Sequence, residues 1–171
     1  KRIPLAGSMS LSHYQTEFDK ILNRDYTTDV VHSLRKEAFA KFFKTGFPTQ
    51  KWENWQYTNL STLVTEPFRV SEILDAPKFP PDIEPYTIEN INTIVIYNGH
   101  YQKAMSTVPD GVQLLSSLDY FEKNSNAVET LEDSPFDLLN TAFMDSEVCF
   151  VVSPDMDVEI PVRILFISNG E

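Results

Sequence analysis

Four prolines within nine residues divide this chain into two parts with different hydrophobic patterns. They are Pro77, Pro80, Pro81 and Pro85. A proline has no backbone N–H to donate and disfavours the helical conformation in the residue before it, so regular structure should lapse here. Apolar residues recur at helical spacing before these prolines and in short strand-like runs after them. We therefore predict a linker over residues 76–92 and an internal boundary within it.

Two helices are expected before the prolines, over residues 14–23 and 29–44. Thr28 or Asp29 can cap the second helix, and Gly46 can end it in a left-handed C′ conformation, after which Phe47 folds back and Pro48 blocks continuation. The apolar stripes are formed by Tyr14, Phe18, Ile21 and Leu22 in the first helix and by Val31, Leu34, Ala38 and Phe42 in the second.

Strands and two short helices are expected after the prolines. Asn98-Gly99 follows a strand-like run and is typical of a two-residue hairpin turn, which places a return strand near Tyr101. Ser134 can cap a helix that has Pro135 in its first position. The apolar residues of this helix are Phe136, Leu138, Leu139, Ala142 and Phe143. The other predicted elements are strands at 93–97, 112–115, 147–152 and 162–167, and a helix that opens at Ser116 or Ser117.

The composition indicates a folded chain rather than a disordered tail, because 42% of its 171 residues are hydrophobic. The net charge is −11, which excludes nucleic acid and anionic membrane as main partners. Ten basic and seven acidic residues lie in 1–70, against four and eighteen in 71–171. The acidic part is either a solubilising surface, which we favour, or a face for a basic partner.

The single cysteine, Cys149, excludes an internal disulfide framework and suits a reducing compartment, so we expect a cytoplasmic protein. No apolar stretch is long enough to span a bilayer. Gly7-Ser8 before Met9 is typical of a cloning remnant, so native sequence is expected to begin near Met9. The last strand-like run stops shortly before Glu171, which indicates a fragment of a longer protein.

No catalytic or metal-binding constellation is found in the sequence. His13, His32 and His100 have no metal-binding spacing, and His100 is expected to be exposed after the hairpin turn. Cys149 lies in an apolar run without a neighbouring base and is interpreted as an inert core residue. The remaining candidates are two acidic groups, Glu129, Glu132, Asp133 and Asp137, and Asp155, Asp157 and Glu159. A solvated face explains these acids, so we assign no catalytic, cofactor-binding or metal-ligating residue.

The segment Trp52-Glu53-Asn54-Trp55-Gln56-Tyr57-Thr58 has two interpretations. In the favoured one, the three aromatic rings pack a helical cap onto the β region, and Glu53 satisfies a backbone or indole N–H. In the other, the rings form a platform for a partner or ligand.

The order of four motifs resembles the SufD proteins of the SufB/SufD family. The motifs are Gly46-Phe47-Pro48-Thr49 with the aromatic segment, Asn98-Gly99-His100-Tyr101, Leu139-Asn140-Thr141-Ala142-Phe143, and Ile160-Pro161-Val162-Arg163-Ile164-Leu165-Phe166. Gln56 departs from the family, which has a basic residue there. The resemblance implies the N-terminal portion of a subunit of the SufBCD complex, which assembles iron–sulfur clusters.

The implied fold is α+β and ends in the first strands of a right-handed parallel β-helix. The domains are residues 1–8 as a cloning remnant, 9–75 as a helical region, 76–92 as the linker, 93–144 as a small α/β region and 145–171 as the start of the β-helix. Because solenoid coils are stable only when stacked, the strands within 147–167 should be frayed or paired with another molecule.

The resemblance also implies the partners SufB and SufC, an assembly role and no enzymatic activity in this fragment. It implies no cofactor here, since the iron–sulfur cluster and the ATP on SufC belong to the whole complex. Two alternatives stay open: a fragment of a β-helix enzyme that acts on carbohydrate through carboxylates, and a protein-interaction module built on the segment Trp52 to Tyr57.

Overall fold

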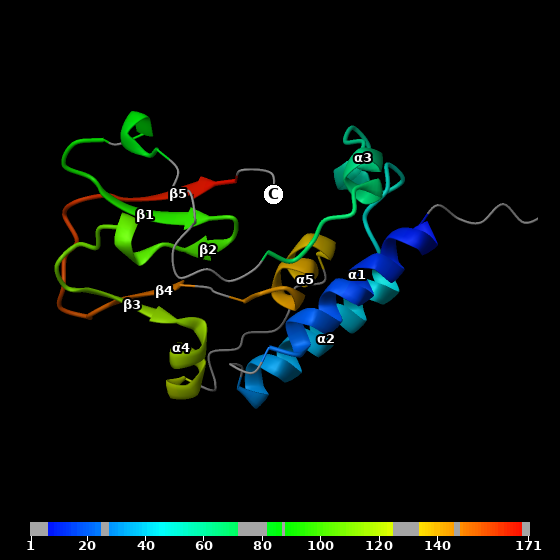
Figure 1. Ribbon diagram of the computed structural model, residues 1–171, viewed down its shortest axis with the longest axis horizontal. Coiled ribbons are helices and arrows are strands. Elements are labelled where there is room, and N and C mark those ends of the chain that lie inside the picture. Colours follow the sequence, from blue (N-terminus) through cyan, green and yellow to red (C-terminus); the bar gives the residue numbers. More distant parts are fainter. Residues whose placement is uncertain are drawn as a thin grey trace, which may run out of the picture. The chain divides into compact units, whose positions relative to one another are not determined.

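The chain divides into two compact units that interleave along the sequence (Figure 1). The computed structural model describes residues 7–24, 28–71, 82–86, 88–124, 134–145 and 148–168. Residues 1–70 and 124–145 make the helical unit, and residues 71–123 and 146–171 make the sheet unit. The presence of helices and small sheets confirms the predicted α+β class.

The helical unit is built around two helices whose apolar stripes face each other. Its elements are α1 (Gly7–Leu22), α2 (Asp29–Thr45), the 3₁₀ turn η1 (Glu53–Trp55), α3 (Ser61–Thr65) and α5 (Pro135–Ala142). The rings of Phe18 on α1 and Phe39 on α2 stack with their centroids 4.0 Å apart. The buried core consists of Tyr14, Phe18, Ala38, Phe39, Phe42, Leu138 and Ala142.

Both ends of α2 form at the residues that the sequence predicts, although the conformation of Gly46 differs from the predicted one. The Thr28 side chain accepts a hydrogen bond from the backbone N–H of Val31, which satisfies one of the donors left over at a helix start. Gly46 has a φ of 70°, and its N–H donates to the carbonyl of Phe42. Its ψ of −172° differs from the left-handed helical value that we expected, and this region of backbone space is open essentially to glycine alone. The ring of Phe47 then packs edge-on against Phe42.

Helix α5 belongs to the helical unit, although we predicted that it would lie with the strands in residues 93–144. Its buried residues Leu138 and Ala142 join the core made by α1 and α2. Pro135 is its first residue, as predicted, whereas Ser134 makes no side-chain capping hydrogen bond. The hydrophobic pattern of α5 therefore identified its apolar face correctly but not the surface that covers it.

The sheet unit contains two separate small sheets. Its elements are η2 (Glu84–Tyr86), β1 (Asn92–Tyr97), β2 (His100–Tyr101), η3 (Lys103–Met105), β3 (Val112–Ser116), α4 (Ser117–Lys123), β4 (Val148–Val152) and β5 (Val162–Ile167). One sheet has the order β2-β1-β5, and the other pairs β3 with β4. Helix α4 begins directly after β3, where the Ser116 hydroxyl accepts a hydrogen bond from the backbone N–H of Asp119.

The predicted hairpin is present at Asn98 and Gly99, which have φ values of 46° and 85°. Positive φ at both central residues matches the tight turn whose twist fits two antiparallel strands. His100, which we expected to be exposed, is buried instead. Its Nε2 lies 2.7 Å from the hydroxyl of Ser71, so a segment that precedes the prolines covers it.

Strand β1 is the centre of the three-stranded sheet. All six of its residues pair in parallel with β5, from Asn92 with Val162 to Tyr97 with Ile167. On the other side of β1, a residue that follows β2 in the sequence also contacts β1. The hydroxyl of Ser106 accepts a hydrogen bond from the backbone N–H of Val95 at 2.9 Å. Ile94 and Val95 are consequently buried, and β5 forms an outer edge of this sheet.

The two strands expected to be frayed or paired with another molecule are both paired within the chain. β4 pairs antiparallel with β3, and β5 pairs in parallel with β1. The prediction failed because strand patterning gives the faces of a strand but not its partner. No stacked β-helix coil occurs within the described residues.

Of the predicted linker, residues 76–81 and 87 lie outside the described residues, which include 82–86 and 88–92 from it. The described part contains the 3₁₀ turn η2, which holds Pro85. Among the described helices, none has the length and apolar character needed to cross a membrane.

Candidate functional site

The aromatic segment after α2 forms a series of tight turns rather than a resumed helix. The N–H groups of Trp52, Trp55 and Thr58 each donate to the carbonyl three residues earlier, at 2.9 Å. The 3₁₀ turn η1 covers Glu53–Trp55, and Trp52 before it is extended, with φ −83° and ψ 132°.

The three aromatic side chains differ in burial, and Tyr57 does not pack as the favoured interpretation expects. Trp55 is half-buried and lies against Phe136 of α5, with ring centroids 5.3 Å apart. Trp52 is 38% exposed and Tyr57 is 91% exposed. Phe136 belongs to the helical unit, so the contact between Trp55 and Phe136 lies within that unit. Glu53 is exposed.

The outer strand β5 presents large apolar side chains to solvent. Ile164 is 50% exposed and Phe166 is 73% exposed, and both lie on one face because side chains alternate along a strand. Their parallel partners on β1 are Ile94 and Ile96. An exposed apolar face next to an outer strand is an unusual surface for a complete monomeric domain, and it marks a candidate interaction surface.

The ribbon of β3 and β4 repeats this pattern. Phe150 and Val152 are exposed on the face that they share with their partners Leu114 and Val112. The sheet unit thus leaves apolar surface uncovered on both of its sheets.

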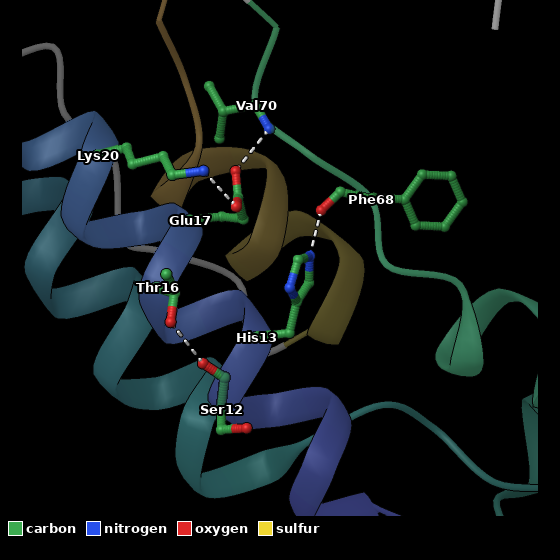
Figure 2. A network of polar contacts seen from close by, with 7 residues as sticks. All are labelled: Ser12, His13, Thr16, Glu17, Lys20, Phe68 and Val70. Carbon is green, nitrogen blue, oxygen red and sulfur yellow. Dashed lines mark hydrogen bonds and ion pairs between the residues drawn. The ribbon is translucent and has the colours of Figure 1, made fainter. Parts of the chain in front are cut away.

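Figure 2 shows a network of polar contacts that α1 makes with the segment after α3. His13 Nε2 lies 2.5 Å from the carbonyl oxygen of Phe68, and Glu17 Oε2 accepts from the N–H of Val70 at 2.9 Å. The other carboxylate oxygen of Glu17 pairs with Lys20 Nζ at 2.6 Å. Both oxygens of this buried carboxylate are therefore satisfied, as burial of a charge requires.

These partners keep Glu17 charged. Burial alone would raise the pKa of the Glu17 carboxyl, but the hydrogen bonds from Lys20 and Val70 and the positive charges of Lys20 and His13 outweigh it and hold the pKa below its usual value. Glu17 was not among the residues predicted for a site, although its position between Tyr14 and Phe18 on the apolar stripe was a signal of burial.

A second buried charge cluster joins α2 to the end of α5. Arg35 is 1% exposed, and its Nη2 lies 3.9 Å from Oδ1 of Asp145. Arg24 forms an ion pair with the same carboxylate. The cluster neutralises charges that the helical packing removes from water, so we interpret it as structural.

The remaining candidate residues do not gather into a site. His32 and Cys149 are half-buried, which agrees with a boundary position for the histidine. Asp137, Asp155, Asp157 and Glu159 are exposed, and Glu129, Glu132 and Asp133 lie outside the described residues. Within the part of the chain that the structure describes, no group of three or more His, Cys, Asp or Glu residues could hold a metal ion.

The fold and its surfaces describe an α+β protein with a closed helical unit and a sheet unit that exposes apolar surface. A protein-family model described as the SufBD protein N-terminal region matches residues 9–164. The chain therefore belongs to this SufB/SufD family, which is a family of iron–sulfur cluster assembly. A comparison with curated proteins finds no match.

Proposed function

We propose that this chain is the N-terminal portion of a SufD-like subunit of the SufBCD complex, where it has a structural and assembly role. Family membership over residues 9–164 supports the assembly of iron–sulfur clusters as the process. The order of the four sequence motifs supports the SufD branch, and partner proteins are expected because family members work in Suf complexes.

The observation that carries the proposal is that, among the described strands, β5 has an unpaired outer edge and an exposed apolar face. This strand is already paired in parallel on one side, is an outer strand of its sheet, and exposes Ile164 and Phe166 on one face. A further parallel strand would satisfy the backbone groups of that edge, and a following coil would bury the apolar face. In our proposal β5 therefore leads into a right-handed parallel β-helix.

In this proposal the fragment carries no chemistry of its own. The iron–sulfur cluster and the ATP bound by SufC belong to the whole complex, and the cytoplasm supplies the reducing conditions that suit both a cluster and a lone thiol. SufB and SufC are the proposed partners, with SufB joined through the β-helix.

A second candidate function rests on the aromatic segment. Trp52 and Tyr57 expose large rings that the helical unit does not use, which favours a protein-interaction module over a purely structural turn. The carbohydrate-enzyme alternative gains no support, because the described members of the two acidic groups, Asp137, Asp155, Asp157 and Glu159, are exposed.

Co-purification from the complete reading frame tests the proposal. The full-length protein, expressed with SufB, SufC and SufD in pairs and together, should be recovered with SufB and SufC. Recovery with SufD in place of SufB would indicate that the chain is a SufB-like subunit rather than a SufD-like one. A folded full-length protein that is recovered with none of them would contradict the assembly role. The variant Tyr57→Ala serves as the matched control, because loss of recovery in this variant would favour the aromatic module.

A further inference from the structure

Two side chains one turn apart on α1 bind the backbone of a segment more than fifty residues further along the chain (Figure 2). A carbonyl oxygen only accepts hydrogen bonds, so Nε2 of His13 must be the donor to Phe68. The carboxylate of Glu17 is the acceptor for the N–H of Val70. The helix thus supplies one donor and one acceptor to a segment three residues long.

The spacing of these groups fits an extended chain. Residues four apart on a helix lie on one face, about 5–6 Å from each other. In an extended segment, the C=O of one residue and the N–H of the residue two further on point to the same side. His13 and Glu17 therefore offer the backbone of residues 68–70 one donor and one acceptor, as the edge of a neighbouring strand would.

The segment contributes little apolar contact of its own to this attachment. The Phe68 ring is 51% exposed, and Arg69 is exposed as well. Glu17, in contrast, is 4% exposed. The attachment therefore depends mainly on the two polar side chains of α1 and on the backbone that they bind.

We infer that His13 and Glu17 form a latch that holds residues 68–70 on the helical unit. The latch lies directly before the point at which the chain passes to the sheet unit, and it opens when Glu17 loses its charge. The passage falls between Val70 and Ser71. On the far side of it, the Ser71 hydroxyl donates to the carbonyl of Asn98 within the sheet unit. The latch thus sets where the helical unit ends.

The direction of the pH response follows from the groups that face Glu17, which among the described residues are Lys20, His13 and the N–H of Val70. They lower the pKa of Glu17 from its ordinary value of 4.5, so the carboxylate stabilises the folded state above about that pH. This contribution is lost as the pH falls through the lowered folded pKa. Acid therefore opens the latch, and neutral or alkaline pH keeps it closed.

The backbone amide of Val70 reports on the latch directly. In the unmodified 171-residue protein, its NMR chemical shift should titrate with a midpoint below 4.5. Glu17→Gln keeps the shape and one acceptor oxygen but cannot titrate, so this transition should vanish. A transition that persists unchanged in Glu17→Gln would overturn the inference.

Hydrogen exchange separates a latch from a general stabilising role. Glu17→Ala should speed exchange of the Val70 amide roughly tenfold or more, since a hydrogen bond to a buried charge is lost. His13→Phe keeps a ring of similar shape and should have a smaller effect on the same amide. The core amide of Phe42 should be unaffected in both variants, and the control Gln15→Ala, on the exposed side of α1, should change neither amide.

Equal acceleration at Val70 and Phe42 would assign Glu17 to overall stability and refute the latch. If Glu17→Ala does not fold, Glu17→Gln and His13→Phe still decide between the two outcomes, because each preserves the size of the side chain.

Discussion

The helical unit has one buried core rich in aromatic rings, whereas the sheet unit exposes large apolar side chains on both of its sheets. In the helical unit, seven buried residues on α1, α2 and α5 form one core, and the ring of Phe42 contacts three other aromatic rings. In the sheet unit, β4 and β5 expose Phe150, Val152, Ile164 and Phe166. The same residue type is thus a core residue in one unit and a surface residue in the other. The difference marks the exposed strand faces of the sheet unit as candidate interaction surfaces.

A matched pair of phenylalanine substitutions gives the strongest test of this contrast. Phe42→Ala should lower the free energy of unfolding by about 3–5 kcal/mol, because a fully buried ring leaves a cavity. Phe166→Ala should change it by less than about 0.5 kcal/mol, because that ring is 73% exposed. Urea unfolding followed by circular dichroism measures both. Equal losses would show that β5 is covered in solution.

The buried charges of the helical unit supply the next largest effect. Asp145→Ala should destabilise the protein by about 3 kcal/mol, because it removes a carboxylate that pairs with the buried Arg35. Asp155→Ala, which removes an exposed carboxylate of the sheet unit, is the control and should be nearly neutral. Thermal unfolding of the two variants compares them. A neutral Asp145→Ala would mean that Arg35 does not depend on this carboxylate.

The aromatic segment allows the same comparison inside the helical unit. Trp55→Ala should cost about 2 kcal/mol, since its half-buried ring packs on Phe136. Tyr57→Ala should cost less than about 0.5 kcal/mol, since its side chain is almost wholly exposed. Differential scanning calorimetry would resolve the two. A large loss with Tyr57→Ala would restore the packing interpretation for the whole segment.

A substitution on the exposed face of β5 should have the smallest effect on stability. It is also the most direct test of the sheet unit as an interaction surface. We expect the protein to self-associate through the strands within 147–167, and Ile164→Lys should weaken that association while changing stability by no more than about 0.5 kcal/mol. Sedimentation velocity over a concentration series measures it. Gln113→Lys adds the same charge at an exposed site on β3 and should leave association unchanged. Equal weakening in both variants would assign the effect to net charge.

Local signals in the sequence predicted local structure well. The Asn98-Gly99 turn and both ends of α2 depend on residues within a few positions of each other, so the pattern contained what was needed. The apolar stripe of α5 was also read correctly, but the helix packs on α2, far away in the sequence. An apolar stripe shows which face of a helix will be buried, but it does not show which element will cover that face.

The errors at individual residues have the same origin. His100 follows a turn and was expected to be exposed, yet Ser71 lies against it. Tyr57 was expected to pack, yet its side chain is 91% exposed, whereas Trp55 two residues earlier contacts Phe136. The buried Glu17 finds its backbone partner at Val70, which no periodicity in α1 could reveal. Tertiary contacts decided each case.

The interleaved order of the two units has a consequence for synthesis on the ribosome. α2 ends at Thr45 and the helix that completes its core begins at Pro135, with most of the sheet unit between them. At translation rates of about 5–20 residues per second, on the order of ten seconds separates the two. During that interval the aromatic face of the first two helices is made but not yet covered. Neither unit can be completed from one continuous stretch of the nascent chain, and the closing of long loops favours slow folding.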